Sequence, residues 1–371
     1  MTEGSGKRRR DAAATTTEGG IASNDYVIRV FDSPAAIDAA AWDALLAAQS
    51  AATPFMRHAY LFALHASGSA VAATGWQPQF LCAFDGDTLI AACPLYVKAH
   101  SYGEYVFDWA WADAYQRHGL HYYPKLLDAV PFTPVPGPRL LALDATGRRV
   151  LLRAMQQLAS NAKLSSAHLL FLDEDDQRAA SAEGWMMRST VQFHWTQREP
   201  APYADFADFL ASLQRDKRKK IQQERRRVVD AGVTFEVLEG AAIAPDDWSF
   251  FYRCYAQTYR EHGASKPYLT RDFFARMGST MPENWLLFVA QRDGQRIAAS
   301  LIGIDPVRRT AFGRYWGALE HIPCLHFDAC YYQPLAWCIA NRYARFEGGA
   351  QGEHKMARGL LPVQTWSAHW L

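Results

Sequence analysis

Residues 100–125 combine carboxylates with aromatic rings in a way that suits amine chemistry. Glu104 and Asp108 can accept the proton that an attacking amine must lose. The rings around them can stack on a sugar or a peptide. The aromatic residues that we expect to contact substrate are Tyr102, Trp109, Trp111, Tyr122 and Tyr123. A twisted strand with one polar face is the alternative, but the variety of ionisable groups favours a site.

A second segment with candidate catalytic and substrate-binding side chains begins at Arg314. We expect Arg314 and Trp316 to contact substrate, and His326 stands at the start of a predicted helix. An imidazole titrates near neutral pH and is the commonest general base, so His326 is a catalytic candidate. A capping or packed histidine explains the same residue equally well.

The third block, Phe346–Arg358, places glycines directly before three ionisable side chains. Gly349 and Gly352 permit positive φ and close approach of a ligand to the backbone. Glu353, His354 and Lys355 follow them and are the remaining catalytic candidates. An acid, an imidazole and an ammonium beside exposed backbone N–H groups can stabilise a tetrahedral intermediate. A β-bulge carrying a surface charge cluster is the alternative.

A strongly basic helix is predicted over residues 206–229. Within 215–227 there are eight cations against Asp216 and Glu224. Such a density of like charges is self-repelling, so a phosphate-rich partner such as an RNA acceptor stem, a lipid pyrophosphate or acyl-CoA would offset it. The residues predicted to bind phosphate are Arg215, Lys219, Lys220, Arg225 and Arg226. A solvated charged face is the alternative.

An internal repeat predicts the elements that carry these blocks. YVIRVFDS at 26–33 matches VTFEVLEG at 233–240, and each half later shows a strand, an Asp-Gly turn and a second strand. HYYPKLL at 121–127 resembles YYQPLAW at 331–337 and serves as the last landmark. Each half therefore reads as strand, helix, helix, β-meander, helix and final strand.

In the second half the predicted bounds are specific. The meander strands are expected at 285–291, 296–304 and 310–317, followed by a helix over about 327–343. Phe346 is expected to begin the last strand. A mixed sheet with helices on its faces follows from this order of elements.

Length, composition and charge limit the class of protein and its domain organisation. The chain has 371 residues and a net charge of +1, which argues against a protein that coats nucleic acid. Residues 1–24 read as a disordered tail, and proline near residue 200 divides a first domain, 25–200, from a second, 201–371. No stretch has the roughly 20 apolar residues of a spanning helix. We expect no metal site and, without an export signal, a cytoplasmic protein.

Three long blocks carry a resemblance to a known family. HSYGEYVFDWAWADAYQRHGLHYYPKLLDAVPFTPVPGPRLL at 100–141, RDKRKKIQQERRRVVDAGVTFEVLEG at 215–240 and FEGGAQGEHKMARGLLPVQTWSAHW at 346–370 look like the bacterial FemAB-like "peptidoglycan biosynthesis/recognition" family. The resemblance covers about residues 26–371. It implies an α/β (α+β) fold of two tandem GNAT-like (acyl-CoA N-acyltransferase) domains, each a mixed sheet flanked by helices.

The resemblance also implies an activity. It indicates an acyl- or aminoacyltransferase that forms an amide on a small-molecule or peptide amine, such as a peptidoglycan precursor, by direct transfer without a covalent intermediate. The co-substrate would be acyl-CoA or aminoacyl-tRNA, with no permanently bound cofactor. Neither half shows the Q/R-x-x-G-x-G/A loop that holds the pyrophosphate of acyl-CoA, which favours the tRNA donor. A non-catalytic module that binds a muropeptide or RNA is the alternative.

These expectations converge on one site. Glu104, Asp108 and Tyr122 from the first half should face His326, Glu353, His354 and Lys355 across a cleft between the halves, because two-domain sites tend to lie there. Asp108 and His354 should both be open to solvent.

Overall fold

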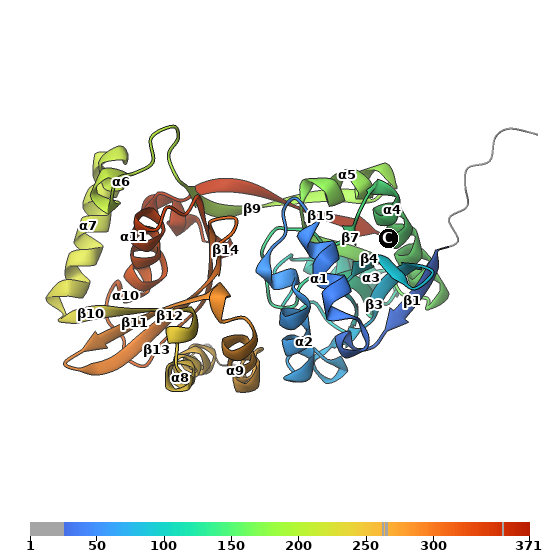
Figure 1. Ribbon diagram of the computed structural model, residues 1–371, viewed down its shortest axis with the longest axis horizontal. Helices are drawn as coiled ribbons and strands as arrows, with labels where there is room; N and C mark the ends of the chain where they lie inside the picture. The colour runs from blue at the N-terminus through green and yellow to red at the C-terminus, as the bar shows by residue number, and fades with distance from the viewer. Residues whose placement is uncertain (1–25, 262, 264–265, 351) are drawn as a thin grey trace, which may run out of the picture.

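The computed structural model describes residues 26–371 except 262, 264, 265 and 351, and shows two lobes side by side (Figure 1). The predicted tail, 1–24, lies outside the described residues. The strands form a four-stranded sheet, β1-β3-β4-β7, and an eleven-stranded sheet that crosses both lobes in the order β10-β11-β12-β13-β14-β9-β15-β8-β6-β5-β2. Among the described residues, none of the helices has the length and hydrophobicity needed to cross a bilayer.

The first half combines short strands with α-helices. Its elements are β1 (Val27–Phe31), α1 (Ala39–Ala47), α2 (His58–Ala66), β2 (Trp76–Pro78), β3 (Phe80–Asp85), β4 (Thr88–Cys93), β5 (Leu95–Lys98), α3 (Trp109–Arg117), β6 (Lys125–Asp128), β7 (Leu141–Ala142), α4 (Ala145–Asn161), β8 (Ala167–Leu172), α5 (Glu174–Ala182) and β9 (Met186–Thr196).

The second half begins with two helices and contains the longer meander. Its elements are α6 (Phe206–Ser212), α7 (Arg215–Asp230), β10 (Val233–Glu239), α8 (Pro245–Glu261), α9 (Arg271–Thr280), β11 (Trp285–Arg292), β12 (Gln295–Asp305), β13 (Thr310–Ala318), α10 (Leu325–Phe327), the π-helical turn η6 (Asp328–Tyr332), α11 (Gln333–Ala340), β14 (Arg345–Ala350), the 3-10 turn η7 (Glu353–Arg358) and β15 (Leu361–Trp370).

The predicted meander is confirmed, since β11, β12 and β13 start and end within a residue of the expected bounds. Both Asp-Gly hairpins are also present, and Gly86 and Gly294 adopt the positive φ values, 58° and 73°, that such turns require. Apolar runs on either side of an Asp-Gly turn were therefore a sufficient signal for these hairpin strands.

Three details of the prediction were wrong. Residues 125–128 form strand β6, whereas Tyr331–Trp337 is helical. The sequence similarity between 121–127 and 331–337 therefore does not mark equivalent elements of the two halves. The helix predicted over 206–229 is broken at Leu213 and Gln214 into α6 and α7. The strand at Phe346, β14, is followed by another, β15.

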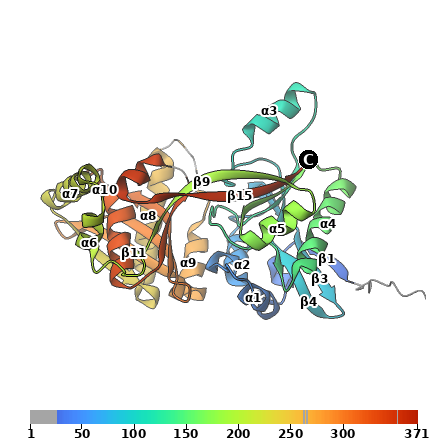
Figure 2. The same ribbon diagram turned by 90° about the horizontal axis from the view of Figure 1, so that it is seen from above.

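The halves exchange their closing strands. In the first half the strands run β5-β6-β8-β15, with an antiparallel, a parallel and an antiparallel pairing. In the second half β12-β13-β14-β9 repeats this pattern. β9 thus closes the sheet of the second half, β15 closes that of the first, and the two pair along their length from Leu361–His194 to His369–Met186 (Figure 2). The division proposed at residue 200 therefore leaves each segment without one strand of its own sheet.

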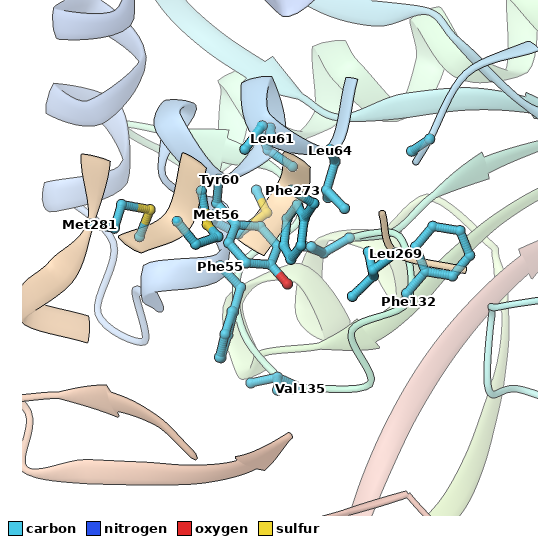
Figure 3. Close-up of a cluster of buried hydrophobic side chains, with 14 of the residues drawn as sticks. Phe55, Met56, Tyr60, Leu61, Leu64, Phe132, Val135, Leu269, Phe273 and Met281 are labelled. Carbon is cyan, nitrogen blue, oxygen red and sulfur yellow. The ribbon is translucent and has the colours of Figure 1, made fainter. Parts of the chain in front are cut away.

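A hydrophobic cluster also joins the halves below the sheet. Phe55 and Tyr60 from the first half pack with Phe273 and Met281 from the second, as Figure 3 shows. The rings of Tyr60 and Phe273 meet edge to face at 5.5 Å. Burial of these side chains removes apolar surface from water on both sides, so the two halves share this cluster as a common core.

Candidate active site

The sheet of the second half opens between β13 and β14. The two strands pair in parallel from Thr310–Arg345 to Phe312–Glu347 and then separate. Both are irregular at this point: the β12–β13 register shifts around Arg314, and the β14–β9 register shifts between Glu347 and Ala350. Bulges re-aim side chains and end strand pairing, and here they open a cavity of about 440 Å³.

The cavity is lined from both halves. The first half supplies Tyr105, Phe132 and Pro134, and the second supplies Tyr255, Thr258, Tyr259, Gly313, Arg314, Tyr315, Trp316, His326, Tyr331, Gly348, Gly349, Ala350, His354 and Lys355. Of the residues predicted from sequence, it therefore brings together Arg314, Trp316, His326, His354, Lys355 and Gly349. Glu353 and Gly352 are neighbours of His354 in the chain but do not line the cavity.

The glycines on β14 are required by the geometry. A Cβ on Gly348 would lie 2.8 Å from the Phe193 carbonyl oxygen, and Gly349 has a φ of 80°. A larger residue at either position would push β14 out of place or strain its backbone. The predicted positive φ is confirmed at Gly349 and at Gly352, where φ is 106°, and close approach of a ligand to this backbone stays a prediction.

Two imidazoles in the cavity are kept neutral. Burial, helped by the nearby His354 and Arg358, lowers the pKa of His326 to about 4. The pKa of His354 is also lowered, by partial burial and by the cations Arg358 and Lys355. The His354 Nε2 lies 3.2 Å from the Tyr331 hydroxyl. Both imidazoles are therefore free to accept a proton at neutral pH, but a pKa of about 4 makes His326 a weak base.

Lys355 places an ammonium at the end of β14. Its Nζ donates to the carbonyl oxygens of Gly349 at 3.0 Å and Ala350 at 3.2 Å. Burial lowers the pKa of Lys355 to about 8. The group is therefore mostly charged at pH 7 and can stabilise negative charge that develops on an oxygen in the cavity.

Arg314 connects the two sides of the cavity. Its Nη2 donates to the Phe132 carbonyl oxygen at 2.8 Å, the Thr133 hydroxyl at 3.2 Å and the Tyr315 hydroxyl at 3.0 Å. The guanidinium also lies 5.1 Å from the centroid of the Phe55 ring. It ties strand β13 to the 129–138 loop of the first half and so positions the walls of the cavity.

The carboxylates predicted in the first half lie elsewhere, in a buried cluster. The Lys125 Nζ donates to Glu104 Oε2 at 2.8 Å and to Asp108 Oδ2, and the Tyr122 hydroxyl donates to the same Asp108 oxygen at 2.7 Å. Asp108 is 4% exposed, so the expectation that it faces solvent was wrong. Neither Glu104 nor Asp108 lines the cavity between β13 and β14.

The electrostatics of this cluster differ from one acid to the other. Burial alone would raise the pKa of Asp108, but Lys125 and hydrogen bonds hold it below its usual value. Burial raises the pKa of Glu104 to about 7 against the opposing effect of Lys125 and Lys98. Asp108 is thus a stable ion-pair partner and a weak base, and its catalytic role remains a prediction.

The predicted aromatic residues of the first half are also dispersed. Trp109, Tyr122 and Tyr123 line a separate open cavity of about 660 Å³ beside α3, the helix that projects from the body in Figure 2. Trp111 stacks under Arg188, whose guanidinium carbon lies 4.6 Å from the ring centroid. The exposed Tyr102 packs against Trp109.

Helix α7 carries the predicted phosphate-binding residues near the cavity. Arg215, Lys219, Lys220 and Arg226 are exposed, whereas Arg225 lies 3.8 Å from Asp328. The other face of α7 is fixed: Glu224 accepts hydrogen bonds from Arg358 at 2.9 and 3.1 Å and from Tyr332. Since Arg358 belongs to η7, the basic helix is held against the turn that carries His354 and Lys355.

Sequence reasoning missed the tyrosines of the cavity. Tyr255 and Tyr259 stand one turn apart on α8, with their hydroxyls 3.1 Å apart, and Tyr105 reaches the same space from the first half. The i, i+4 spacing on α8 was a usable signal. Tyr105 stands within the block that was singled out, but the pattern there pointed to the carboxylates beside it. No grouping of three or more potential metal ligands occurs among the described residues.

Comparison with known proteins adds a family and a fold. Residues 33–371 match the FemAB-like family model, described as peptidoglycan biosynthesis/recognition. No curated protein matches the sequence.

Three solved structures are similar across most of the chain. L-PGS from Bacillus licheniformis has a TM-score of 0.55 at 10% identity, covering 90% of this chain and 92% of that one. FemX has a TM-score of 0.54 at 10% identity, covering 90% and 96%. A conserved protein of unknown function from Bacteroides thetaiotaomicron has a TM-score of 0.53 at 12% identity, covering 93% and 100%. The predicted fold class, two tandem GNAT-like domains of mixed sheet and helices, is confirmed.

Proposed function

Because the chain belongs to the FemAB-like family, we propose that it is an acyl- or aminoacyltransferase that forms an amide on an amine acceptor in the cavity between β13 and β14. The observation that carries the proposal is the position of that cavity. It lies where two parallel strands part, and it holds neutral imidazoles and an ammonium together.

The residues of the cavity can perform each step of a direct transfer. The amine nitrogen attacks the carbonyl carbon of the donor, and His354, whose pKa is lowered, accepts the proton that the amine loses. The carbonyl oxygen becomes negative in the tetrahedral intermediate and faces the Lys355 ammonium. Collapse breaks the bond to the sulfur of a CoA thioester or to the ribose oxygen of an aminoacyl ester, and the protonated His354 returns its proton to this leaving group. The chain itself forms no covalent bond to the acyl group.

His326 is the second base candidate within the same cavity. It lies edge to face with Trp316 at 5.5 Å and with Tyr331 at 5.8 Å. This aromatic enclosure keeps the imidazole neutral and restricts its movement. Together with Tyr105 and Tyr259, it gives the acceptor a surface of rings on which to lie.

The acceptor and donor are proposed by chemical class. A peptidoglycan precursor or another peptide amine suits the aromatic walls and the family description. The donor is acyl-CoA or aminoacyl-tRNA, and in either case its phosphates can reach the exposed cations of α7. Lys220 contributes to lowering the pKa of His354, which places this cation near the reacting groups.

A labelled-transfer assay tests the proposal. Purified protein is incubated with a cell extract and either radiolabelled acyl-CoAs or radiolabelled aminoacyl-tRNAs, and products are treated with hydroxylamine, which cleaves esters and thioesters but leaves amides. We expect hydroxylamine-resistant label with one donor class. His354→Ala should abolish most of it, and His321→Ala, which changes an exposed histidine outside the cavity, should not.

The same experiment addresses the non-catalytic alternative. A protein that retains a muropeptide or RNA but transfers no label from either donor class would be a recognition module. The tyrosine walls of the cavity would then serve binding alone.

A further inference from the structure

A second cavity lies where the exchanged strands meet, apart from the proposed transfer site. Its volume is about 490 Å³, and residues of both halves line it. One wall comes from β13, β14, β9 and β15, and another from the segment 50–53 and the start of α5. Phe132 and Pro134 line the transfer cavity, whereas Pro136 and Gly137 of the same loop line this one.

Two buried carboxylates line this cavity with an unsatisfied oxygen each. Glu347 is 3% exposed, and its Oε2 accepts no hydrogen bond from the described residues. Asp173 is 8% exposed; its Oδ1 caps α5 by accepting from the Asp176 N–H at 2.9 Å, while its Oδ2 has no partner among the described residues. Buried polar atoms in native proteins are rarely left without partners, so a ligand that donates hydrogen bonds would complete this site.

The surrounding charges favour a cation over an anion. Of the two arginines that line the cavity, Arg345 lies 3.3 Å from Glu347 Oε1, and Arg308 lies 3.7 Å from Asp305 and donates to the Gln49 carbonyl oxygen. Both guanidiniums are thus already engaged. The lining also includes Glu174, so carboxylates outnumber arginines by four to two.

The surroundings of Glu347 shift its pKa. Burial raises the pKa of Glu347 to about 7, against the opposing effect of Arg345 and Arg314. Across the sheet its register partner is His194, whose pKa burial lowers to about 3, so this imidazole remains neutral and adds no positive charge. A positively charged ligand would supply the missing counter-charge.

We propose that this cavity is a binding site for a primary ammonium group, held between Glu347 and Asp173. The site is distinct from the transfer cavity and does not depend on the proposed transfer reaction. Its ligand class is a polar aliphatic amine, because an ammonium offers three donors and each carboxylate has an acceptor to fill.

Calorimetric titration with 1,4-diaminobutane tests the proposal, with 1,4-butanediol as the uncharged probe of similar size. Wild-type protein should bind the diamine saturably and the diol not at all. Glu347→Gln and Asp173→Asn should each weaken binding by about tenfold or more, since each removes a charged acceptor. Asp293→Asn, which changes an exposed turn residue that lines neither cavity, should bind as the wild type does.

The pH dependence gives a second measurement. Ionisation of Glu347 should make diamine binding about tenfold tighter at pH 8 than at pH 6, and Glu347→Gln should remove this difference. Absence of saturable diamine binding, or binding that is unchanged in both carboxylate variants, would overturn the proposal. Melting curves for all variants establish that each is folded, and Asp173→Asn preserves the test if Glu347→Gln does not fold.

Discussion

The two halves contain the same junction of parallel strands and use it differently. In the second half, β13 and β14 part after Phe312 and Glu347, and a cavity occupies the opening. In the first half, β6 and β8 pair up to Asp128 and Leu169, but the chain beyond β6 turns back into the opening. Its residue Gly137 donates to the Phe171 carbonyl oxygen at 3.0 Å and forms a bridge with Leu172.

A buried arginine fixes the loop that fills the junction of β6 and β8. The buried Arg139 donates to the Leu170 carbonyl oxygen at 2.8 Å and to the Val135 carbonyl oxygen. The same 129–138 loop presents Phe132 and Thr133 to Arg314 of the second half. The loop that fills one junction thus supports the open one. Under the proposed function, the first half is the supporting half and the second half carries the chemistry.

The largest effect should come from breaking the buried cluster of the supporting half. Lys125→Met leaves Glu104 and Asp108 buried without their shared cation, which should lower the free energy of unfolding by about 3–5 kcal/mol. Chemical denaturation measures it. If the first half only supports the site, the transfer rate per folded molecule of Lys125→Met should stay near the wild-type value. A complete loss of transfer in folded protein would move catalysis into the first half.

Paired substitutions at His354 and Asp108 separate chemistry from support. His354→Ala should lower the transfer rate on the order of a hundredfold, about 2.7 kcal/mol, because a proton acceptor is lost. Its melting temperature should hardly change, since His354 is exposed. Asp108→Asn should instead lower the melting temperature and leave the rate per folded molecule within a few-fold. Rates and melting curves measured on the same preparations decide between the two outcomes.

Neutralising α7 should have a smaller effect. Lys219→Gln, Lys220→Gln and Arg226→Gln together should weaken binding of a polyanion such as tRNA by about tenfold at moderate salt and reduce the salt-dependence slope by about 3. Arg225 is left intact because it lies beside Asp328. An equal change at Arg149, Arg153 and Arg178 of the first half is the control. Unaltered retention of the triple variant on a polyanion column would remove α7 from the proposed site.

The smallest effect should appear in the pH profile of transfer. The lowered pKa of His354 means that the rate should hold as pH falls through 6.5, the usual value for histidine. The rate should then halve as pH rises to about 8, where Lys355 loses its proton and its positive charge. A profile of kcat/KM against pH, with Lys355→Arg extending the alkaline limb, tests this assignment.

Much of the open half could be predicted from sequence because its signals are local. Apolar runs on either side of an Asp-Gly turn specified β11 and β12, and the glycines before His354 and Lys355 marked the end of β14. The filled half was less predictable. Residues 121–127 and 331–337 have similar amino-acid sequences. However, short aromatic segments that contain a proline show no hydrophobic periodicity that would distinguish a strand from a helix. The partner of Asp108 lies 17 positions along the chain, beyond the reach of any spacing rule.

The exchange of β9 and β15 places a constraint on how the protein is made. β15 is translated only after the whole second half, yet it is an internal strand of the sheet of the first half, between β8 and β9. While the nascent chain is still short of residue 361, β8 therefore presents an unpaired edge. Such edges invite wrong partners. During synthesis the edge of β8 therefore stays unpaired until the second half has emerged. Pairing of β15 with β8 and β9 then completes the continuous sheet of both halves.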